Sequence, residues 1–247
     1  MKAFLTMTLT ELKLSMRAYV YVFFAFIFPP MMLLLFGSIY GNTPSDFYGG
    51  HGAVDVLTPA YIAMILAVSG IMGLPLSLAE YRQNKVLKRY KATPIGAVTI
   101  MTPHLLVNAL MSIGGMAILI IVGKLLFDLH FLGNPFYFIL AFLLSLASIF
   151  SIGFLISAIA PNNRTATAIA YLVYFPMLFL SGATIPLQVM PEAVRTVSEF
   201  IPLTYCVKIL QGTWMGSPIG NFGAESLVLL AILAACTGLS IIFFRWE

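Results

Sequence analysis

Long runs of uncharged, apolar residues recur along this chain, and they restrict its fold more than any other feature. Residues 18–40 and 56–79 are two such runs, and neither contains an Asp, Glu, Lys or Arg. About 20 apolar residues in a helix suffice to cross a hydrocarbon core about 30 Å thick. Only 9% of the residues are charged, whereas soluble domains have about 25%. The chain is therefore predicted to be an integral membrane protein.

The spans are predicted to be helices, because the alternating ten-residue segments of a membrane barrel are absent from the sequence. The pattern indicates an all-α polytopic fold, with 1–247 as a single membrane domain. Two adjacent prolines, Pro29 and Pro30, are expected to bend the first span. Six spans are predicted, at residues 19–40, 56–79, 100–123, 135–158, 165–182 and 226–244.

Residues 2–17 project as an amphipathic helix, and 1–18 is predicted to lie in the membrane interface. The alternative is a simple cytoplasmic extension of the first span. No small-residue cleavage site follows, so an uncleaved start is expected. The apolar stripe holds Leu5, Leu9, Leu12 and Met16, and the neighbouring stripe holds Lys2, Thr6, Thr10, Lys13 and Arg17.

Residues 183–225, here called the outer segment, are neither fully apolar nor an ordinary polar loop. Prolines divide the segment, and its pieces at 192–200 and 203–211 are predicted to be short amphipathic helices. Six spans place both termini on one side of the membrane. That side carries ten of the thirteen Lys and Arg residues, so the positive-inside rule puts the termini in the cytoplasm and the outer segment outside.

Several kinds of chemistry are disfavoured by what the spans lack. Apart from His104 they contain no Asp, Glu, Lys, Arg or His, and His104 is expected to be an interfacial or hydrogen-bonded group rather than a proton relay. Neither a phosphate-binding loop nor a GxSxG motif occurs, and the three histidines are scattered over three regions. Cys206 and Cys236 are expected to be free thiols. The chain is thus predicted not to be an enzyme and to hold no cofactor or metal; any ATP hydrolysis must come from a partner.

Residues 80–96, EYRQNKVLKRYKATPIG, form the densest charged region, here called the basic stretch. One interpretation is an anchor beside anionic lipid, where each Lys or Arg contributes about 1 kcal/mol. The apolar residues Val86, Leu87 and Tyr90 interleave with the basic ones at helical spacing, and Thr93-Pro94 ends the pattern. A short helix with an apolar ridge and a basic flank also suits docking into a groove of a soluble protein.

The basic stretch resembles the cytoplasmic loop of bacterial ABC transporter permeases of the type-2 export family, which commonly reads E-R-E-x-G-T-L-x-x-L-R-x-T-P. The shared positions are Glu80, Leu87 or Val86, Lys88-Arg89, Lys91 and Thr93-Pro94; Asn84-Lys85 stands where Gly-Thr is usual. Residues 181–211 are similar to a second motif of that family, through Ser181-Gly182, Pro186, Pro191 and Pro202-Leu203-Thr204-Tyr205.

This resemblance, which covers essentially the whole chain, implies the permease subunit of an ATP-driven exporter in the bacterial cell membrane. Its implied partners are an ATPase subunit that holds ATP and Mg, a second permease chain (identical or not) and membrane lipid, but no nucleic acid. The implied cargo is hydrophobic or amphipathic: a drug, antimicrobial peptide, lipid or glycan. The competing hypothesis is a non-transporting scaffold or sensor subunit, which a neighbouring ATPase gene would disfavour.

The same resemblance assigns candidate site residues in three groups. For the aromatic group, ordinary packing is the alternative interpretation. The coupling loop (80–98) supplies Glu80, Arg82, Lys85, Leu87, Lys88, Arg89, Tyr90, Lys91, Thr93 and Pro94; the substrate path holds Phe23, Phe26, Tyr171, Tyr174, Phe175 and Phe179; and the outer gate holds Gly182, Pro186, Pro191, Pro202 and Tyr205.

Overall fold

The computed structural model describes residues 2–84 and 97–243, and this part of the chain is helical without any β-strand. The all-α prediction is confirmed. The longer helices are α1 (Lys2–Arg17), α2 (Tyr19–Val22), α3 (Phe28–Tyr40), α4 (Ala53–Ala67), α5 (Leu74–Gln83), α7 (Ala97–Phe127), α8 (Pro135–Ile159), α9 (Asn163–Leu180), α10 (Glu192–Ser198), α11 (Pro202–Trp214) and α12 (Gly223–Phe243), with π-helical turns η1 (Phe23–Ile27) and η3 (Val68–Gly73) and 3-10 turns η2 (Asp46–Tyr48), η4 (Leu187–Val189) and η5 (Ile219–Phe222).

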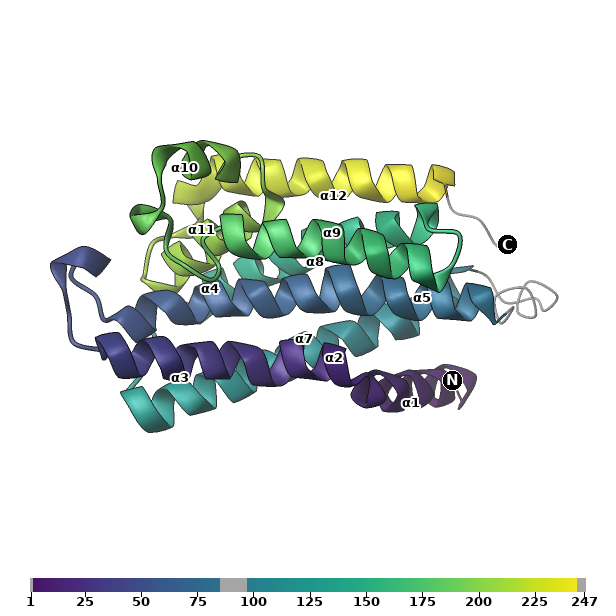
Figure 1. Ribbon diagram of the computed structural model, residues 1–247, viewed down its shortest axis with the longest axis horizontal. Helices are drawn as coiled ribbons and strands as arrows, with labels where there is room; N and C mark the ends of the chain where they lie inside the picture. The colour runs from purple at the N-terminus through teal and green to yellow at the C-terminus, as the bar shows by residue number, and fades with distance from the viewer. Residues whose placement is uncertain (1, 85–96, 244–247) are drawn as a thin grey trace.

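Within the described residues, five helical segments are long and apolar enough to cross a membrane. They confirm that the chain is an integral membrane protein. The predicted span at 165–182 forms α9, which lies beside the others (Figure 1). This helix begins with the polar residues Asn163 and Arg164, so its mean hydropathy is lower than that of the five segments. The count of six spans therefore stays a prediction. The five segments are Tyr19–Tyr40, Ala53–Gln83, Met101–Phe127, Pro135–Ile159 and Ile219–Phe243.

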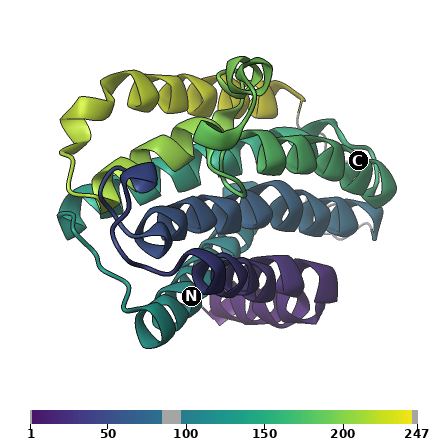
Figure 2. The same ribbon diagram turned by 60° about the vertical axis from the view of Figure 1, so that its left-hand side comes forward.

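The bundle has two different ends (Figure 1). One end holds α1, the last turn of α5 and the first turn of α9, and we call it the basic end because Arg17, Arg82 and Arg164 lie there. The opposite end, the loop end, holds α10 and the loop between α3 and α4. Figure 2 turns the loop end forward and shows α11 between α4 and α12. From α3 to α9, successive long helices run in opposite directions between these two ends, with α4 and α5 counting as one helix.

The continuous helix formed by α4, η3 and α5 is the core of the bundle. Every residue of α4 except Val56 is buried, and helices α3, α7, α8 and α11 pack around it. A helix that is apolar on all sides is stable only when other helices or lipid surround it. Small residues such as Ala63 and Gly70 let the neighbouring backbones come close.

The first span is irregular just before its prolines. A π-helical turn, η1, occupies Phe23–Ile27, and the helix then continues through Pro29 and Pro30. Proline has no N–H, so Pro29 cannot donate to the carbonyl of Ala25, and a wide turn accommodates that gap. The irregularity thus falls one turn earlier than the two prolines that the sequence singles out.

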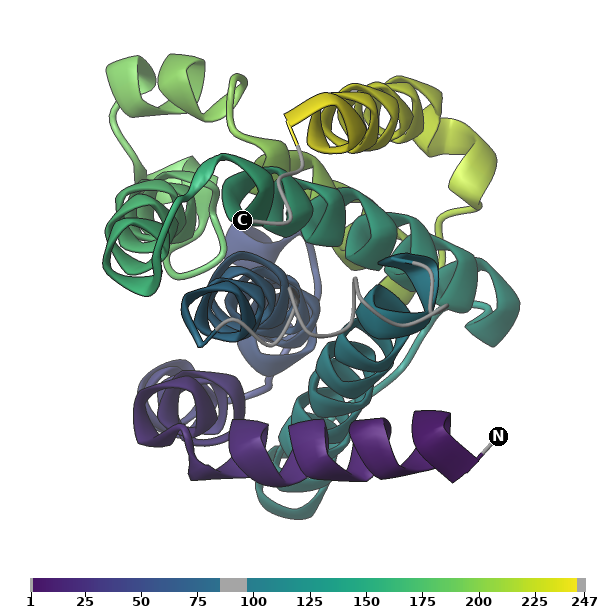
Figure 3. The ribbon, with the colours of Figure 1, turned by 90° about the vertical axis from the view of Figure 1, so that its right-hand side faces the viewer.

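Helix α1 crosses the basic end while α3, α4 and α9 are seen nearly end-on (Figure 3). Its inner face packs on α7 and buries Thr8 and Glu11. Leu5, Leu9 and Met16 of the predicted apolar stripe are each at least half exposed. An exposed apolar stripe is what an interfacial helix would present to lipid, and that location remains a prediction.

Candidate functional site

Two of the predicted coupling residues, Glu80 and Arg82, lie in the described part of the basic end. Arg82 is buried, and its Nη1 donates a 2.9 Å hydrogen bond to the carbonyl of Ser157 and a second to that of Ala160. These carbonyls end α8, where the helix dipole favours a cation. Arg82 therefore fixes the end of α5 against α8, whereas Glu80 is exposed.

The other eight predicted coupling residues lie outside the described residues, so their docking role stays a prediction. Helix α5 ends at Gln83 and α7 begins at Ala97, and both of these ends are at the basic end. The basic stretch is therefore joined directly to the central helix. The eight residues are Lys85, Leu87, Lys88, Arg89, Tyr90, Lys91, Thr93 and Pro94.

A cavity of about 430 Å³ opens at the basic end between α1, α2, α5 and α9. We call it the basic-end cavity. Its floor is formed by η3 and α5, and its remaining walls come from α1, α2 and the start and middle of α9. Its volume falls in the range of small-molecule sites, about 300–1,000 Å³. The wall includes the charged residues Glu11, Arg17 and Glu80, the tyrosines Tyr19, Tyr21, Tyr81 and Tyr171, and the apolar residues Leu14, Val20, Met72 and Leu76.

Glu11 and His104 form a buried pair beside this cavity. Oε1 of Glu11 lies 2.8 Å from Nδ1 of His104, and both side chains are almost inaccessible to solvent. Oγ of Ser77 lies 3.3 Å from the same nitrogen, and the ring of Tyr81 meets the imidazole edge-on. The pair connects α1 to α7. The expectation that His104 is hydrogen-bonded agrees with this geometry.

The sequence did not single out Glu11 as a site residue. The only local signal is the spacing of Thr8, Glu11 and Ser15, which puts three polar side chains on one face of α1, the face that packs inward. A second polar group, Asn108, lies one turn beyond His104. Its Oδ1 accepts a 3.1 Å hydrogen bond from the hydroxyl of Tyr21, so α2 is also connected to α7.

The predicted substrate-path aromatics are distributed over two environments. Phe23 is exposed on η1, Phe175 and Phe179 are exposed on α9, and Tyr171 lines the basic-end cavity. Tyr174 is fully buried. Phe26 is half-buried against α7, where a Cβ on Gly114 would lie 3.2 Å from its ring.

Phe24, which the sequence analysis did not select, is the aromatic that joins the first span to α9. Its ring centroid lies 6.2 Å from that of Tyr174 and 6.4 Å from that of Phe175, both nearly perpendicular. A π-helical turn has more residues per turn than an α-helix, so the side chains of residues 23–27 point in other directions than α-helical spacing predicts. Helical periodicity therefore could not identify which Phe faces α9.

The outer segment folds as the predicted pair of short helices, α10 and α11, at the loop end. Gly182 has φ +83°, and the chain turns there out of α9. Pro191 precedes α10, and Pro202 occupies the first turn of α11, as proline favours. Tyr205 donates a 2.6 Å hydrogen bond to the carbonyl of Glu199.

Pro186, the remaining predicted gate residue, lines a second cavity of about 370 Å³. This cavity lies between the end of α3, residues 43–48, the start of α4 and residues 185–189. Beside it, Arg195 donates hydrogen bonds to the carbonyls of Met190 and Gln188 and so holds the turn before α10. Whether the segment moves as a gate stays a prediction.

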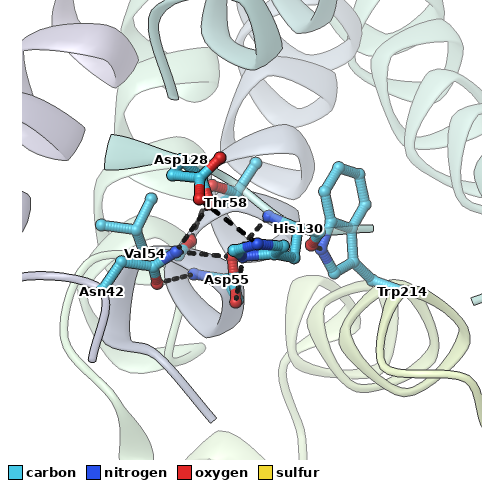
Figure 4. A network of polar contacts seen from close by, with 7 residues as sticks. All are labelled: Asn42, Val54, Asp55, Thr58, Asp128, His130 and Trp214. Atoms are coloured by element: carbon cyan, nitrogen blue, oxygen red, sulfur yellow. Dashed lines mark hydrogen bonds and ion pairs between the residues drawn. The ribbon is translucent and has the colours of Figure 1, made fainter. Parts of the chain in front are cut away.

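A polar network joins four parts of the loop end (Figure 4). Oδ1 of Asp55 accepts hydrogen bonds from Nδ2 of Asn42 at 3.0 Å and from the backbone N–H of His130 at 2.8 Å. The His130 imidazole lies 3.5 Å from a carboxylate oxygen of Asp128, and the indole N–H of Trp214 donates to the His130 carbonyl at 3.1 Å. The α3–α4 loop, α4, the α7–α8 loop and α11 are thereby connected.

Comparison with known proteins adds to this geometry. Nodulation protein J from Rhizobium leguminosarum bv. viciae is 37% identical over 71 residues, which are 29% of this chain and 27% of that protein. The probable multidrug ABC transporter permease YbhS of Escherichia coli (strain K12) is 23% identical over 180 residues, 72% of this chain and 47% of that protein. ABC transporter G family member 20 from Dictyostelium discoideum is 26% identical over 171 residues, which are 68% of this chain and 22% of that protein.

The chain thus matches less than half the length of each of these relatives. The model of the ABC-2 type transporter family, by contrast, matches residues 2–215, which is most of the chain. Since the described helices also include five that can cross a membrane, this protein belongs to the ABC-2 type transporter family as a membrane-spanning component.

Proposed function

We propose that this chain is the permease subunit of an ATP-driven exporter and that the basic stretch docks on a separate ATPase subunit. The match of the ABC-2 family model across residues 2–215 carries this proposal. The 247 residues contain no phosphate-binding loop, and in this proposal ATP is hydrolysed by a separate subunit. The permease relative YbhS and the resemblance of the basic stretch point in the same direction.

In this proposal the basic end faces the bacterial cytoplasm. Arg17, Arg82 and Arg164 lie at this end, and the other four Lys and Arg residues of the basic stretch follow Arg82 in the sequence. Cytoplasmic loops of membrane proteins are enriched in Lys and Arg. Both termini would then be cytoplasmic, and the outer segment would lie on the far side.

The central helix offers a physical connection from the docking region to the loop end. The basic stretch begins in the last turn of α5, and α5 is continuous with η3 and α4. At the far end, Nε2 of Gln211 in α11 donates a 3.0 Å hydrogen bond to the carbonyl of Val56 in α4. Movement of a docked ATPase would therefore displace a helix that is bonded to the outer segment.

The path for the cargo would follow the face of η1 and α9, against a second permease chain. Phe23 of η1 and Phe175 and Phe179 of α9 are exposed, and in this proposal they belong to one apolar surface of the kind that contacts a partner, ligand or lipid. A hydrophobic or amphipathic cargo suits that surface. A relative described as a probable multidrug permease is consistent with such a cargo.

The test replaces Leu87 and Tyr90 together by Ala. A docking helix buries its apolar ridge, and each side chain contributes about 1.5–3 kcal/mol when fully buried, whereas a lipid anchor depends on the charges alone. The matched control replaces Leu227 and Leu230, exposed apolar residues near the start of α12, by Ala. We expect normal membrane insertion of both variants, with loss of ATPase pull-down and transport only in the first.

Retention of ATPase binding and export by the Leu87/Tyr90 variant would refute docking through the basic stretch. Failure of the unaltered chain to capture any ATPase that hydrolyses ATP in reconstituted vesicles would instead favour a non-transporting scaffold. The two failures are distinct because the first concerns the site of coupling and the second concerns the activity itself.

A further inference from the structure

One residue in the wall of the basic-end cavity, Glu11, has a buried carboxylate oxygen without a hydrogen-bond partner among the described residues. Glu11 lines the cavity and is only 2% exposed. Its Oε1 is occupied by His104, whereas its Oε2 has no hydrogen-bond partner among the described residues. A buried carboxylate oxygen left without a hydrogen bond is unfavourable, because it has lost its contact with water and gained no other donor. A site that leaves this oxygen free is complementary to a ligand that donates a hydrogen bond.

The rim of the cavity adds a second carboxylate. Glu80 and Arg17 line the cavity from its exposed edge. No ion pair between Arg17 and either carboxylate is found among the described residues. The wall therefore offers two carboxylates to a ligand against one guanidinium, and the deeper charge is negative.

The remaining wall is apolar and aromatic. Leu76 and Met72 belong to this lining, as do Tyr21 from α2 and Tyr171 from α9. Aromatic faces attract organic cations, and apolar walls accept the body of an amphiphile. The cavity thus has an acceptor at depth and room for an apolar group beside it.

We infer that the basic-end cavity binds the protonated amine of an amphipathic molecule, with Oε2 of Glu11 accepting its N–H and the apolar wall accepting its body. This inference rests on the proposed function, because it names the class of cargo that an exporter would take up at its cytoplasmic end. The same chemistry occurs in soluble amphiphilic amines and in the headgroup of phosphatidylethanolamine, and the experiment separates these sources.

The test measures binding of 4-phenylbutylamine and of its neutral analogue 4-phenylbutanol to the purified full-length chain in maltoside detergent, by isothermal titration. The parent chain should prefer the amine by roughly tenfold, the effect of one hydrogen bond to a charged group. Glu11→Gln should abolish this preference. Glu225→Gln, the same chemical change at the loop end, should retain it. Equal preference in the Glu11→Gln variant and the parent, or no preference in the parent, overturns the inference.

A second measurement keeps the test decisive if Glu11→Gln misfolds. Leu14 lines the cavity and is 47% exposed, so a Leu14→Cys variant in a Cys236→Ser background should react with maleimide. The amine should slow this reaction and the alcohol should not. Equal rates with the amine and the alcohol contradict the inference.

Lipid nanodiscs separate the two sources of the amine. If phosphatidylethanolamine displaces 4-phenylbutylamine and phosphatidylcholine does not, a lipid headgroup can occupy the site; if neither displaces it, the ligand is a soluble amphiphile. Binding is measured without an ATPase, so loss of export in the Leu87/Tyr90 variant and loss of amine preference in Glu11→Gln report on separate claims.

Discussion

Gly153 in α8 stands where the backbone of one helix touches the backbone of another, and its replacement by Ala should separate them. A Cβ at Gly153 would lie 1.9 Å from the carbonyl oxygen of Gly70 in η3 and 3.0 Å from its carbonyl carbon. Carbon–oxygen contacts between helices are normally about 3.3–3.6 Å. The two backbones would therefore have to move apart by roughly 1.4 Å.

The approach at Gly70 has a local cause in the sequence. Within η3 the N–H of Leu74 donates to Ser69, and Pro75 has no N–H to offer the carbonyl of Gly70. That carbonyl can lean out of the helix toward Gly153, where a Cα–H contact is worth about 0.5–1 kcal/mol. Any side chain at position 153 removes this contact.

The expected size of the effect follows from opposing contributions. Overpacking of a close contact is unfavourable by about 1–3 kcal/mol, and contact with backbone puts this site at the upper end. Replacing Gly by Ala in a helix is itself favourable by about 1 kcal/mol. Gly153→Ala should therefore lose about 2 kcal/mol of stability, whereas Gly238→Ala in α12, where a Cβ meets nothing within 4 Å, should gain up to about 1 kcal/mol.

Thermal unfolding of the purified chain in detergent checks this prediction. The two variants should differ by about 3 kcal/mol, or roughly 6–12 °C in Tm for a chain of this size. Identical melting temperatures for the Gly153→Ala and Gly238→Ala variants would show that α8 and η3 are not in backbone contact.

Two further perturbations address the loop end. Asp55→Asn should lower the Tm by several degrees, because Asp55 is buried and accepts bonds from Asn42 and His130 that are worth about 1.5–3 kcal/mol each when charged; an unchanged Tm would contradict the network in Figure 4. Val194→Cys in a Cys236→Ser background should react with an impermeant maleimide from outside, and to different extents in different nucleotide states. Burial raises the pKa of the Cys206 thiol to about 12, so this native cysteine should stay unlabelled. Labelling from the cytoplasm alone would reverse the topology, and labelling that does not depend on nucleotide would argue against gating.

The sequence was sufficient to predict the elements that depend on local composition. Apolar runs located the spans, and prolines located the starts of α10 and α11 within a residue or two. Helix α9 was located as well, although Asn163 and Arg164 in its first turn reduce its hydropathy. These features are local because helix formation in lipid depends on the residues of the segment itself.

Features that depend on contact between distant segments could not be predicted. The π-helical turns η1 and η3 depend on how the first two spans pack, and η1 changes which of Phe23 and Phe24 faces α9. The partner of His104 is 93 positions earlier in the chain, on a helix whose amphipathic pattern pointed to a different face. The sequence pattern of either helix alone does not predict that the two residues are paired.

The pairing explains why a chain with so few intramembrane charges has one here. Oε1 of Glu11 and Nδ1 of His104 are hydrogen-bonding partners. A buried ionisable pair contributes less to stability than apolar groups of the same size. A pair that served only to attach α1 to α7 could be replaced by Leu and Phe with little loss. Glu11 also lines the basic-end cavity, and its second oxygen has no hydrogen-bond partner among the described residues. Stability alone therefore does not account for an acceptor at this position. Replacing Glu11 by Leu and His104 by Phe together separates the structural role of the pair from amine binding. This double variant should keep the Tm of the parent chain and lose its preference for an amine.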